Sequence, residues 1–262
     1  MSGSLNGRTI VVTRSRKQAE TFARALERAG ARVVALPTIE TVDPESWDAV
    51  DDSIRLLAEG AFDCVAFTSA NGVEGFFKRL RRLPSEVFRD VRVAAVGVAT
   101  ARAVEAAGVM VDLVPESYTA GALAAALGGG GGSILLPRAA DVPPELVDVL
   151  VAGGWDVHEV AVYRTIPASD EDPAVEIVRA GKYDAVTFTS ASTVKGFVGM
   201  LGVPPELQAS AGSPEHLVAC IGPVTAKVCS DLGLRVDVVA EEHTSPGLIE
   251  ALIGRIGGTI DG

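Results

Sequence analysis

The sequence predicts an α/β fold made of two similar three-layer domains, each with a parallel sheet that helices cover on both faces. Short apolar strands alternate with helical patterns through most of the 262 residues, as is typical of parallel sheets buried on both sides. Similar segments return in the same order about half a chain apart. Two extended stretches, at 36–45 and 158–173, interrupt the alternation in the way that connectors between domains do.

The first strand and helix illustrate the alternation. RTIVVT, at 8–13, is rich in β-branched residues, and residues 16–29 carry apolar side chains at helical spacing. Ser15 and Gln18 have the spacing of a capping box, and Gly30 stands where a helix commonly ends in the left-handed conformation. Further strands are predicted at 31–36, 63–68, 92–97, 110–114, 133–137, 184–189, 217–222 and 235–240.

An internal repeat relates the two halves of the chain. FTSANG, at 67–72, returns 121 positions later as FTSAST, at 188–193. Residues 93–127 also align with residues 218–252 without a gap, at an offset of 125. Because the matches keep one order along the chain, they favour duplication over chance similarity between strand–helix segments.

A third match pairs RTIVVTRS, at 8–15, with SILLPRAA, at 133–140. It sets Arg14 against Arg138, each after the first strand of its unit. A guanidinium group binds carboxylates and phosphates with two parallel hydrogen bonds. A single surface arginine is usually just solvated, but the matched pair indicates that each unit has an anion-binding edge.

Composition limits the classes of protein and of partner. The length and the 48% hydrophobic content suit one large domain or two of about 100–150 residues. A net charge of −11 opposes a nucleic-acid partner, which needs a concentrated basic face. Three cysteines, an odd number, indicate buried free thiols in a reducing compartment. Without an export signal or an apolar run long enough for a membrane, we expect a cytoplasmic protein.

The repeated turns are candidates for ligand binding. In open parallel sheets, ligands bind beyond the carboxyl ends of the strands, where helix N-termini present unpaired N–H groups. Both turns are expected there, with Asn71 and Ser192 as helix N-caps. Ser69 and Ser190 would add hydroxyl donors for a carboxylate or phosphate. The alternative is that these turns serve only as caps.

Other residues extend this edge. Thr100 in GVATA and Thr225 in GPVTA repeat the arrangement of a hydroxyl after a strand. Lys195 stands near the second turn, whereas the first turn has no lysine and would depend on main-chain N–H groups. Tyr163, in the connector segment VAVYRT, could extend a phenol into a cleft, although a buried structural role stays open at this point.

Several other chemistries find no support. His158, His216 and His243 have no metal-ligand spacing with each other or with cysteine, so no metal site is expected. No G-x-G-x-x-G motif follows a strand, and neither a Walker sequence nor a G-x-S-x-G motif is present. Asp63 and Asp184 precede strands at the opposite end of the sheets and are interpreted as turn residues.

Together, the segments TRSR, FTSANGV, FTSASTV, CIGPVTA, AEEHTSPGL and VYRT resemble the uroporphyrinogen-III synthase family over residues 8–252. The resemblance implies two flavodoxin-like α/β domains joined by a two-stranded antiparallel linker, with the active site in the cleft between them. It implies a discontinuous domain formed by 1–36 and 168–262, a second domain at 44–158, and connectors at 37–43 and 159–167.

The resemblance also implies an activity that needs no cofactor. The substrate would be hydroxymethylbilane, a linear tetrapyrrole with eight carboxylates, which loses water, inverts its last ring through a spiro intermediate and closes as uroporphyrinogen III. Tyr163 would be the acid that assists departure of hydroxide. The motif positions that line the family's cleft are Arg14, Ser69, Thr100, Ser190 and Thr225, and geometry adds Arg138 and Lys195.

The expected partners follow from the same resemblance. We expect a monomer that contacts neither nucleic acid nor membrane and that meets the upstream bilane-forming enzyme transiently. Two other classes stay open: a two-lobed solute-binding protein without chemistry, and a synthase-like sensor whose effector domain lies elsewhere.

Overall fold

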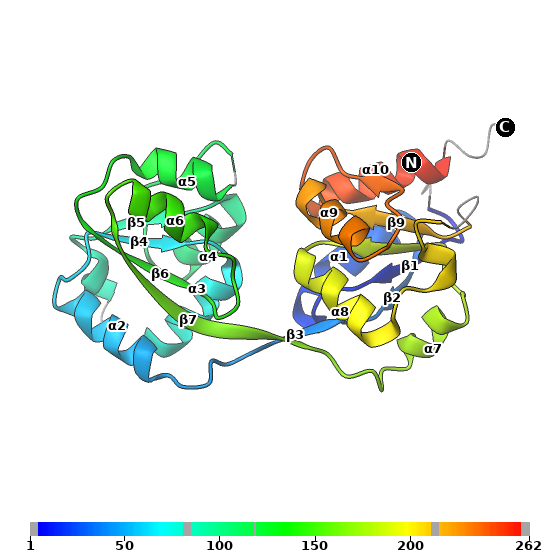
Figure 1. Ribbon diagram of the computed structural model, residues 1–262, viewed down its shortest axis with the longest axis horizontal. Helices are drawn as coiled ribbons and strands as arrows, with labels where there is room; N and C mark the ends of the chain where they lie inside the picture. Colours follow the sequence, from blue (N-terminus) through cyan, green and yellow to red (C-terminus); the bar gives the residue numbers. More distant parts are fainter. Residues whose placement is uncertain (1–4, 81–84, 118, 211–214, 258–262) are drawn as a thin grey trace. The chain divides into compact units, whose positions relative to one another are not determined.

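The computed structural model describes residues 5–80, 85–117, 119–210 and 215–257. The chain divides into two compact units (Figure 1). Unit 1 combines Met1–Glu40 with Ile166–Gly262, and unit 2 is Thr41–Thr165. Unit 1 is therefore built from both ends of the sequence, drawn blue and yellow to red, whereas unit 2 is one continuous segment.

Unit 1 contains a five-stranded sheet in the order β2-β1-β8-β9-β10, and each neighbouring pair is parallel. Taken in chain order this is 2-1-3-4-5, so the direction of winding reverses between β1 and β8. The strands are β1 (Thr9–Val12), β2 (Arg32–Ala35), β8 (Ala185–Phe188), β9 (Leu217–Cys220) and β10 (Val238–Val239). The helices are α1 (Arg16–Arg28), α7 (Ala174–Arg179), α8 (Ala191–Leu201), α9 (Pro223–Asp231) and α10 (Ser245–Gly257), with a 3-10 turn at Pro205–Leu207.

Unit 2 repeats this order for four of its five strands, with a different chain connection; its fifth strand, β3, lies at the edge opposite to the one that β10 occupies in unit 1. Its sheet runs β3-β7-β6-β4-β5, and the pairs β7-β6, β6-β4 and β4-β5 are parallel. The strands are β3 (Ile39–Val42), β4 (Cys64–Phe67), β5 (Arg92–Ala95), β6 (Ser133–Ala139) and β7 (Asp156–Pro167). The helices are α2 (Asp48–Ala58), α3 (Ala70–Leu80), α4 (Val98–Ala106), α5 (Ala120–Leu127) and α6 (Glu145–Ala152), with a 3-10 turn at Ser85–Phe88.

Each sheet is covered on both faces, as the near-continuous apolar strands predict. In unit 1, α1 and α10 pack on one face, and α7, α8 and α9 pack on the other. In unit 2, α2, α3 and α4 cover one face, and α5 and α6 cover the other. The three-layer α/β architecture with parallel strands is therefore confirmed for each unit.

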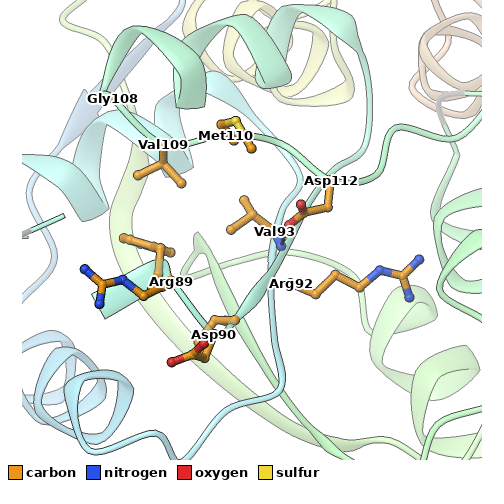
Figure 2. A pocket seen from close by; sticks show the side chains of 10 residues that line it. Arg89, Asp90, Arg92, Val93, Gly108, Val109, Met110 and Asp112 are labelled. Atoms are coloured by element: carbon orange, nitrogen blue, oxygen red, sulfur yellow. Dashed lines mark hydrogen bonds between the residues drawn. The ribbon is translucent and has the colours of Figure 1, made fainter. Parts of the chain in front are cut away.

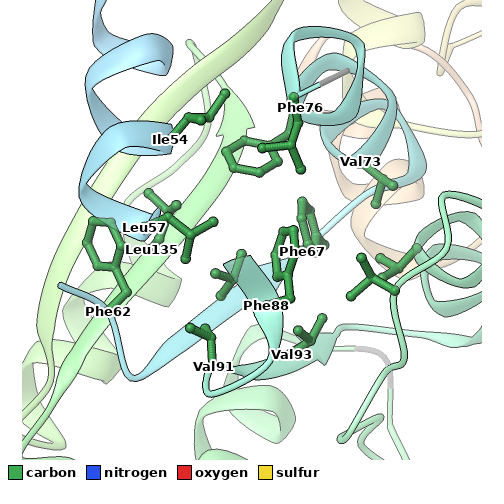
Figure 3. Packing of buried hydrophobic residues seen from close by; sticks show 14 of the residues in the cluster. Ile54, Leu57, Phe62, Phe67, Val73, Phe76, Phe88, Val91, Val93 and Leu135 are labelled. Carbon is green, nitrogen blue, oxygen red and sulfur yellow. The ribbon is translucent and has the colours of Figure 1, made fainter. Parts of the chain in front are cut away.

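Aromatic packing holds the first repeated turn in place. Figure 3 shows Phe67, at the end of β4, facing Phe76 of α3, and their ring centroids are 5.9 Å apart. The rings of Phe188 and Phe197 form the matching edge-to-face pair in unit 1, at 5.3 Å. Such pairs add to the stabilisation from buried area, so the duplicated strand–turn–helix is fixed by the same contact in both units.

Three predictions about local structure are wrong. Residues 110–114 form no strand; they contribute one isolated bridge, from Leu113 to Ala94. The Asp112 carboxylate accepts from the Val93 N–H at 2.7 Å, but Asp237 makes the same contact to the Val218 N–H at 2.8 Å, beside a strand that does form. The second error concerns Ser15, which is at the N-cap of α1 but whose side chain makes no capping hydrogen bond. The prediction for the other end of this helix is correct, because Gly30 follows α1 in the left-handed region, with φ at 95°.

The third error concerns the caps of the repeated turns. Asn71 and Ser192 both lie inside their helices rather than before them. Ser190 is the N-cap of α8 and forms a capping box with Thr193, and Ser69 accepts a hydrogen bond from the Gly72 N–H at 3.0 Å. The helices therefore begin two residues earlier than predicted, since a serine nearer to the strand can satisfy the same first-turn donors.

Candidate functional site

Tyr163 and Ser69 meet at the carboxyl edge of the unit 2 sheet. Tyr163 lies on β7, half-buried against the main hydrophobic cluster of the unit, and Ser69 lies between β4 and α3. Their hydroxyl oxygens are 3.3 Å apart, and the Tyr163 carbonyl accepts from the Ala140 N–H at 3.0 Å. A phenol is thus fixed beside the first turn of α3, where main-chain N–H groups face outward.

Two glycines allow α3 to approach β6 and β7 closely. A Cβ at Gly72 would lie 2.9 Å from the Pro137 carbonyl oxygen, and a Cβ at Gly75 would lie 2.5 Å from that of Val162. Neither distance is tolerated by any larger residue without movement of the helix. Because Val162 precedes Tyr163, the close packing at Gly75 fixes the distance between the phenol and the turn.

Arg14 occupies the matching edge of unit 1, at the point where the winding reverses. It follows β1, and its Nε donates to the Thr189 hydroxyl at 2.9 Å, directly after β8. Its guanidinium carbon lies 4.9 Å from the centre of the Phe22 ring. The hydrogen bond therefore crosses the reversal point, the position at which ligands bind in sheets of this order.

The charge of Arg14 has no carboxylate partner among the residues that the structure describes. Its side chain is half-buried, and burial lowers the pKa of the guanidinium because the low-dielectric surroundings disfavour the charged form. A desolvated cation without an anion beside it is unfavourable. Such a group is suited to an anionic ligand.

Buried threonines form a rigid base below Arg14. The Thr13 hydroxyl donates to the Thr187 carbonyl at 2.7 Å, and the Thr187 hydroxyl donates to the Val11 carbonyl at 2.9 Å. The Thr38 hydroxyl donates to the Thr193 carbonyl at 2.9 Å, which ties the chain after β2 to the first turn of α8. These contacts connect β1, β8 and α8 without using any group at the edge.

Arg138, the counterpart of Arg14, is held differently. Its side chain is only 4% exposed, and its Nη1 donates to Glu159 at 2.9 Å while its Nη2 donates to the Pro143 carbonyl at 2.8 Å. Its Nε is buried and has no hydrogen-bond partner among the described residues. The structure therefore gives Arg138 a carboxylate partner from within its own unit.

Thr100 and Thr225 occupy equivalent positions, each at the third residue of its helix, α4 or α9. Both are nearly buried, at 5% and 4% exposure. Within the described ranges neither hydroxyl hydrogen-bonds to another group, in contrast to Thr193 of α8. Both helices start after a glycine that provides no capping side chain, so their first-turn N–H groups remain available to a ligand.

Two further predicted site residues, Ser190 and Lys195, make fewer contacts that indicate a role. Ser190 is half-buried, and its hydroxyl lies 2.9 Å from that of Ser192. Lys195 is exposed on α8 and forms no ion pair with any described residue. The structure brings Tyr163 together with Ser69 in unit 2, and it places Arg14 and Ser190 at one edge of unit 1.

Two cavities lie away from these edges. One, of about 550 Å³, is at the amino end of β5 in unit 2 and is lined by residues that include Arg89, Arg92, Met110 and Asp112 (Figure 2). The other, of about 540 Å³, lies between β10 and α10 in unit 1. None of the predicted site residues lines either cavity.

The aspartates before the strands are structural, as their position suggested. Asp184 accepts from the Thr9 N–H at 2.7 Å and from Arg8 at 2.8 Å. Asp63 accepts from the Ser133 N–H at 2.8 Å. These carboxylates satisfy strand starts at the edge opposite to the repeated turns.

Three residues of the edges were missed from the sequence. Thr189 orients Arg14, Glu159 neutralises Arg138, and Gly196 brings α8 close to the Thr38 carbonyl. Gly196 could have been found, because Gly75 and Gly196 match at the same offset as the repeated turns. No signal in the sequence distinguishes Thr189 from Thr68, its counterpart in the first turn.

The comparisons with known proteins agree over most of the chain. The family model described as uroporphyrinogen-III synthase HemD matches residues 20–250. The chain is 33% identical over 254 residues to a uroporphyrinogen-III synthase of Synechococcus elongatus, with 95% of each chain covered. It is 30% identical over 253 residues to one of Chlorobaculum parvum, covering 94% of this chain and 98% of the relative.

Solved structures of similar fold also come from uroporphyrinogen-III synthases. A uroporphyrinogen III synthase variant of Thermus thermophilus superposes with a TM-score of 0.70 at 21% identity, covering 96% of this chain and 100% of that one. The uroporphyrinogen-III synthetase of Helicobacter pylori gives a TM-score of 0.64 at 18% identity, covering 94% and 99%. At these identities the likeness concerns the fold.

Proposed function

Because the chain belongs to the uroporphyrinogen-III synthase family, we propose that the residues at its two carboxyl edges bind and cyclise the substrate of that family. The protein is an enzyme, a lyase of porphyrin and heme biosynthesis. It converts hydroxymethylbilane to uroporphyrinogen III with loss of water, inversion of the terminal pyrrole ring through a spiro intermediate, and closure of the macrocycle. The roles of individual residues are our proposal.

Tyr163 is the acid in this proposal. The substrate must lose a hydroxide from its terminal carbon, and the hydroxyl of a phenol can donate a proton to the leaving oxygen. The contact that supports this role is the 3.3 Å separation between the Tyr163 and Ser69 hydroxyls. Ser69 can accept a hydrogen bond from the phenol before substrate binds and can donate one to the phenolate afterwards, so it orients the ring in both states.

Ring inversion depends mainly on how the bilane is held. The cation left by hydroxide departure must meet the substituted carbon of the last ring rather than its free carbon, so positioning decides the product. Arg14, Ser190 and Thr225 in unit 1, together with Thr100 in unit 2, supply a cation, hydroxyls and helix N-termini for the substrate's carboxylates. Lys195 would serve a carboxylate nearer to solvent.

We also propose the finer organisation of the molecule. The discontinuous domain at 1–36 and 168–262 and the domain at 44–158 would be joined by connectors at 37–43 and 159–167 as an antiparallel two-stranded linker. The support is that β3 and β7 are neighbours in one sheet and that both cross the boundary between the units. In the part of the chain that the structure describes, no helix combines the length and the apolar character needed to cross a membrane.

The cellular setting completes the proposal. We propose a monomer in the cytoplasm that receives its short-lived substrate during transient contact with the enzyme that makes the bilane. Three buried free thiols support a reducing compartment.

Product analysis tests the function directly. Purified protein is supplied with fresh hydroxymethylbilane, the products are oxidised, and type I and type III uroporphyrins are separated by chromatography. We expect type III to predominate, because closure without the enzyme gives type I. Type I alone, formed at the rate of the protein-free control, would exclude the activity and favour a binding or sensor protein.

A further inference from the structure

The duplicated arginines are held by opposite ends of their guanidinium groups. In Arg14 the Nε is bonded, to Thr189, and the two Nη atoms have no hydrogen-bond partner among the described residues. In Arg138 the two Nη atoms are bonded, to Glu159 and Pro143, and the Nε is left without a partner in the same described part of the chain. The two arginines at this duplicated position therefore make different contacts, although the repeat aligns them.

The contacts of Arg14 leave free the part of the group that binds carboxylates best. A guanidinium has five N–H donors in one plane, and bidentate binding uses two parallel ones. The Phe22 ring lies near the guanidinium at 4.9 Å, and Thr189 fixes the Nε side at 2.9 Å. Rotation of the guanidinium about its last bonds is restricted by both contacts, so the free Nη donors keep one direction.

The residues around Thr189 restrict its movement, so its hydroxyl can hold Arg14 in one position. Its neighbour Thr187 is fixed by two hydrogen bonds to β1, through the Thr13 hydroxyl and the Val11 carbonyl. Ser190, the next residue, caps α8 through the Thr193 N–H. The Thr189 hydroxyl therefore sits between a fixed strand end and a fixed helix start, and Arg14 is its only hydrogen-bond partner within the described residues.

We propose that Thr189 is a positioning residue that holds Arg14 with both Nη groups free for one substrate carboxylate, while Arg138 is structural and does not bind substrate. This inference rests on the proposed function, and it names which of the two matched edges carries the arginine that binds. The arginine that binds a carboxylate of the bilane is then assigned to unit 1.

Steady-state kinetics of three variants test the positioning role. Thr189→Val keeps the shape and removes the acceptor, Thr189→Ser keeps the acceptor, and Thr68→Val makes the same change in the other turn, where the threonine does not bond to Arg138. We expect Thr189→Val to raise KM roughly tenfold, the effect of one hydrogen bond to a charged group, with kcat changed less than about threefold. Thr189→Ser and Thr68→Val should stay within about twofold of the parent KM.

A binding readout separates this role from general damage to the fold. Uroporphyrin III, an octacarboxylate, is titrated by fluorescence, and thermal unfolding is recorded for each variant. Weaker porphyrin binding by Thr189→Val, with an unchanged melting temperature and rescue by Thr189→Ser, supports the proposal. An unchanged KM and unchanged porphyrin binding in Thr189→Val, or equal losses in Thr68→Val, would overturn it.

The two proposals fail in different ways. A parent enzyme that forms no type III product contradicts the proposed function itself. A parent enzyme that forms type III product, with Thr189→Val indistinguishable from it, contradicts only the positioning role of Thr189.

Discussion

Tyr163 is the one phenol that β7 presents at the edge of the unit 2 sheet, and removing its hydroxyl tests the acid role. We expect Tyr163→Phe to lower kcat by roughly 10²–10⁴, the usual contribution of a positioned acid, if departure of hydroxide limits the rate. Steady-state rates of the two proteins measure this. The matched control is Tyr183→Phe, because Tyr183 is buried in unit 1 and bonded to Glu206 at 3.1 Å. Equal rates for Tyr163→Phe and the parent would remove this residue from the chemistry.

Arg14 and Arg138 should respond to alanine in opposite ways. Arg138→Ala removes a buried guanidinium that is paired with the exposed Glu159 and bonded to the Pro143 carbonyl, so we expect the free energy of unfolding to fall by about 2 kcal/mol. Arg14→Ala removes a desolvated charge, so stability should hold while KM rises. Urea unfolding and substrate kinetics on both variants distinguish the roles. A loss of stability in Arg14→Ala with none in Arg138→Ala would reverse the assignment.

The packing of α8 on the chain after β2 depends on the absence of a side chain at Gly196. A Cβ there would lie 2.3 Å from the Thr38 carbonyl oxygen, so we expect Gly196→Ala to destabilise the protein by about 1–3 kcal/mol through displacement of the helix. Gly199 lies on the same helix, but a Cβ at this position would meet no atom within 4 Å, so Gly199→Ala should be neutral or stabilising. Equal melting temperatures for the two variants would contradict the close approach.

Buried thiols on two strands and a helix predict a loss of stability at alkaline pH. Burial raises the pKa of Cys64 from 9.0 to about 12, and a hydrogen bond to Cys220 followed by burial raises the pKa of Cys229. The folded state therefore keeps protons that the unfolded chain releases. This contribution to stability is present below pH 9.0 and is lost as the pH rises towards about 12.

Urea unfolding at about pH 8 and about pH 11 measures this alkaline loss. The control is Cys64→Ala, which cannot ionise and should show a smaller decrease in the free energy of unfolding over the same interval. A decrease of the same size in Cys64→Ala would assign the effect to other groups.

The periodicity of apolar residues predicted most helices and strands, but it predicted their first and last residues less well. The β-branched runs predicted β1, β4, β6, β8 and β9 because such strands are buried on both faces. Residues 110–114 look the same in composition, yet they contribute one isolated bridge between Leu113 and Ala94 in place of a ladder. The capping residues were misplaced because serine and asparagine are equally good caps, and only the position of the preceding strand decides between them.

Across the whole molecule, the duplication could be found from the sequence, but its divergence could not. The matched positions located both edges and the pair of arginines. The use of each arginine depends on partners distant in the chain: Thr189 for Arg14, and Glu159 on β7 for Arg138. A repeat of local motifs carries no information about such contacts, so the sequence could not distinguish the surroundings of the two arginines.

The most direct measurement follows the bond that ring inversion must create. Hydroxymethylbilane is labelled with ¹³C at its hydroxymethyl carbon and at the substituted α-carbon of its terminal ring, and the product is examined by NMR. The account predicts a one-bond ¹³C–¹³C coupling, because the cation attacks the substituted carbon and that bond persists in uroporphyrinogen III. A product without this coupling, in which the hydroxymethyl carbon has joined the free α-carbon, would contradict it.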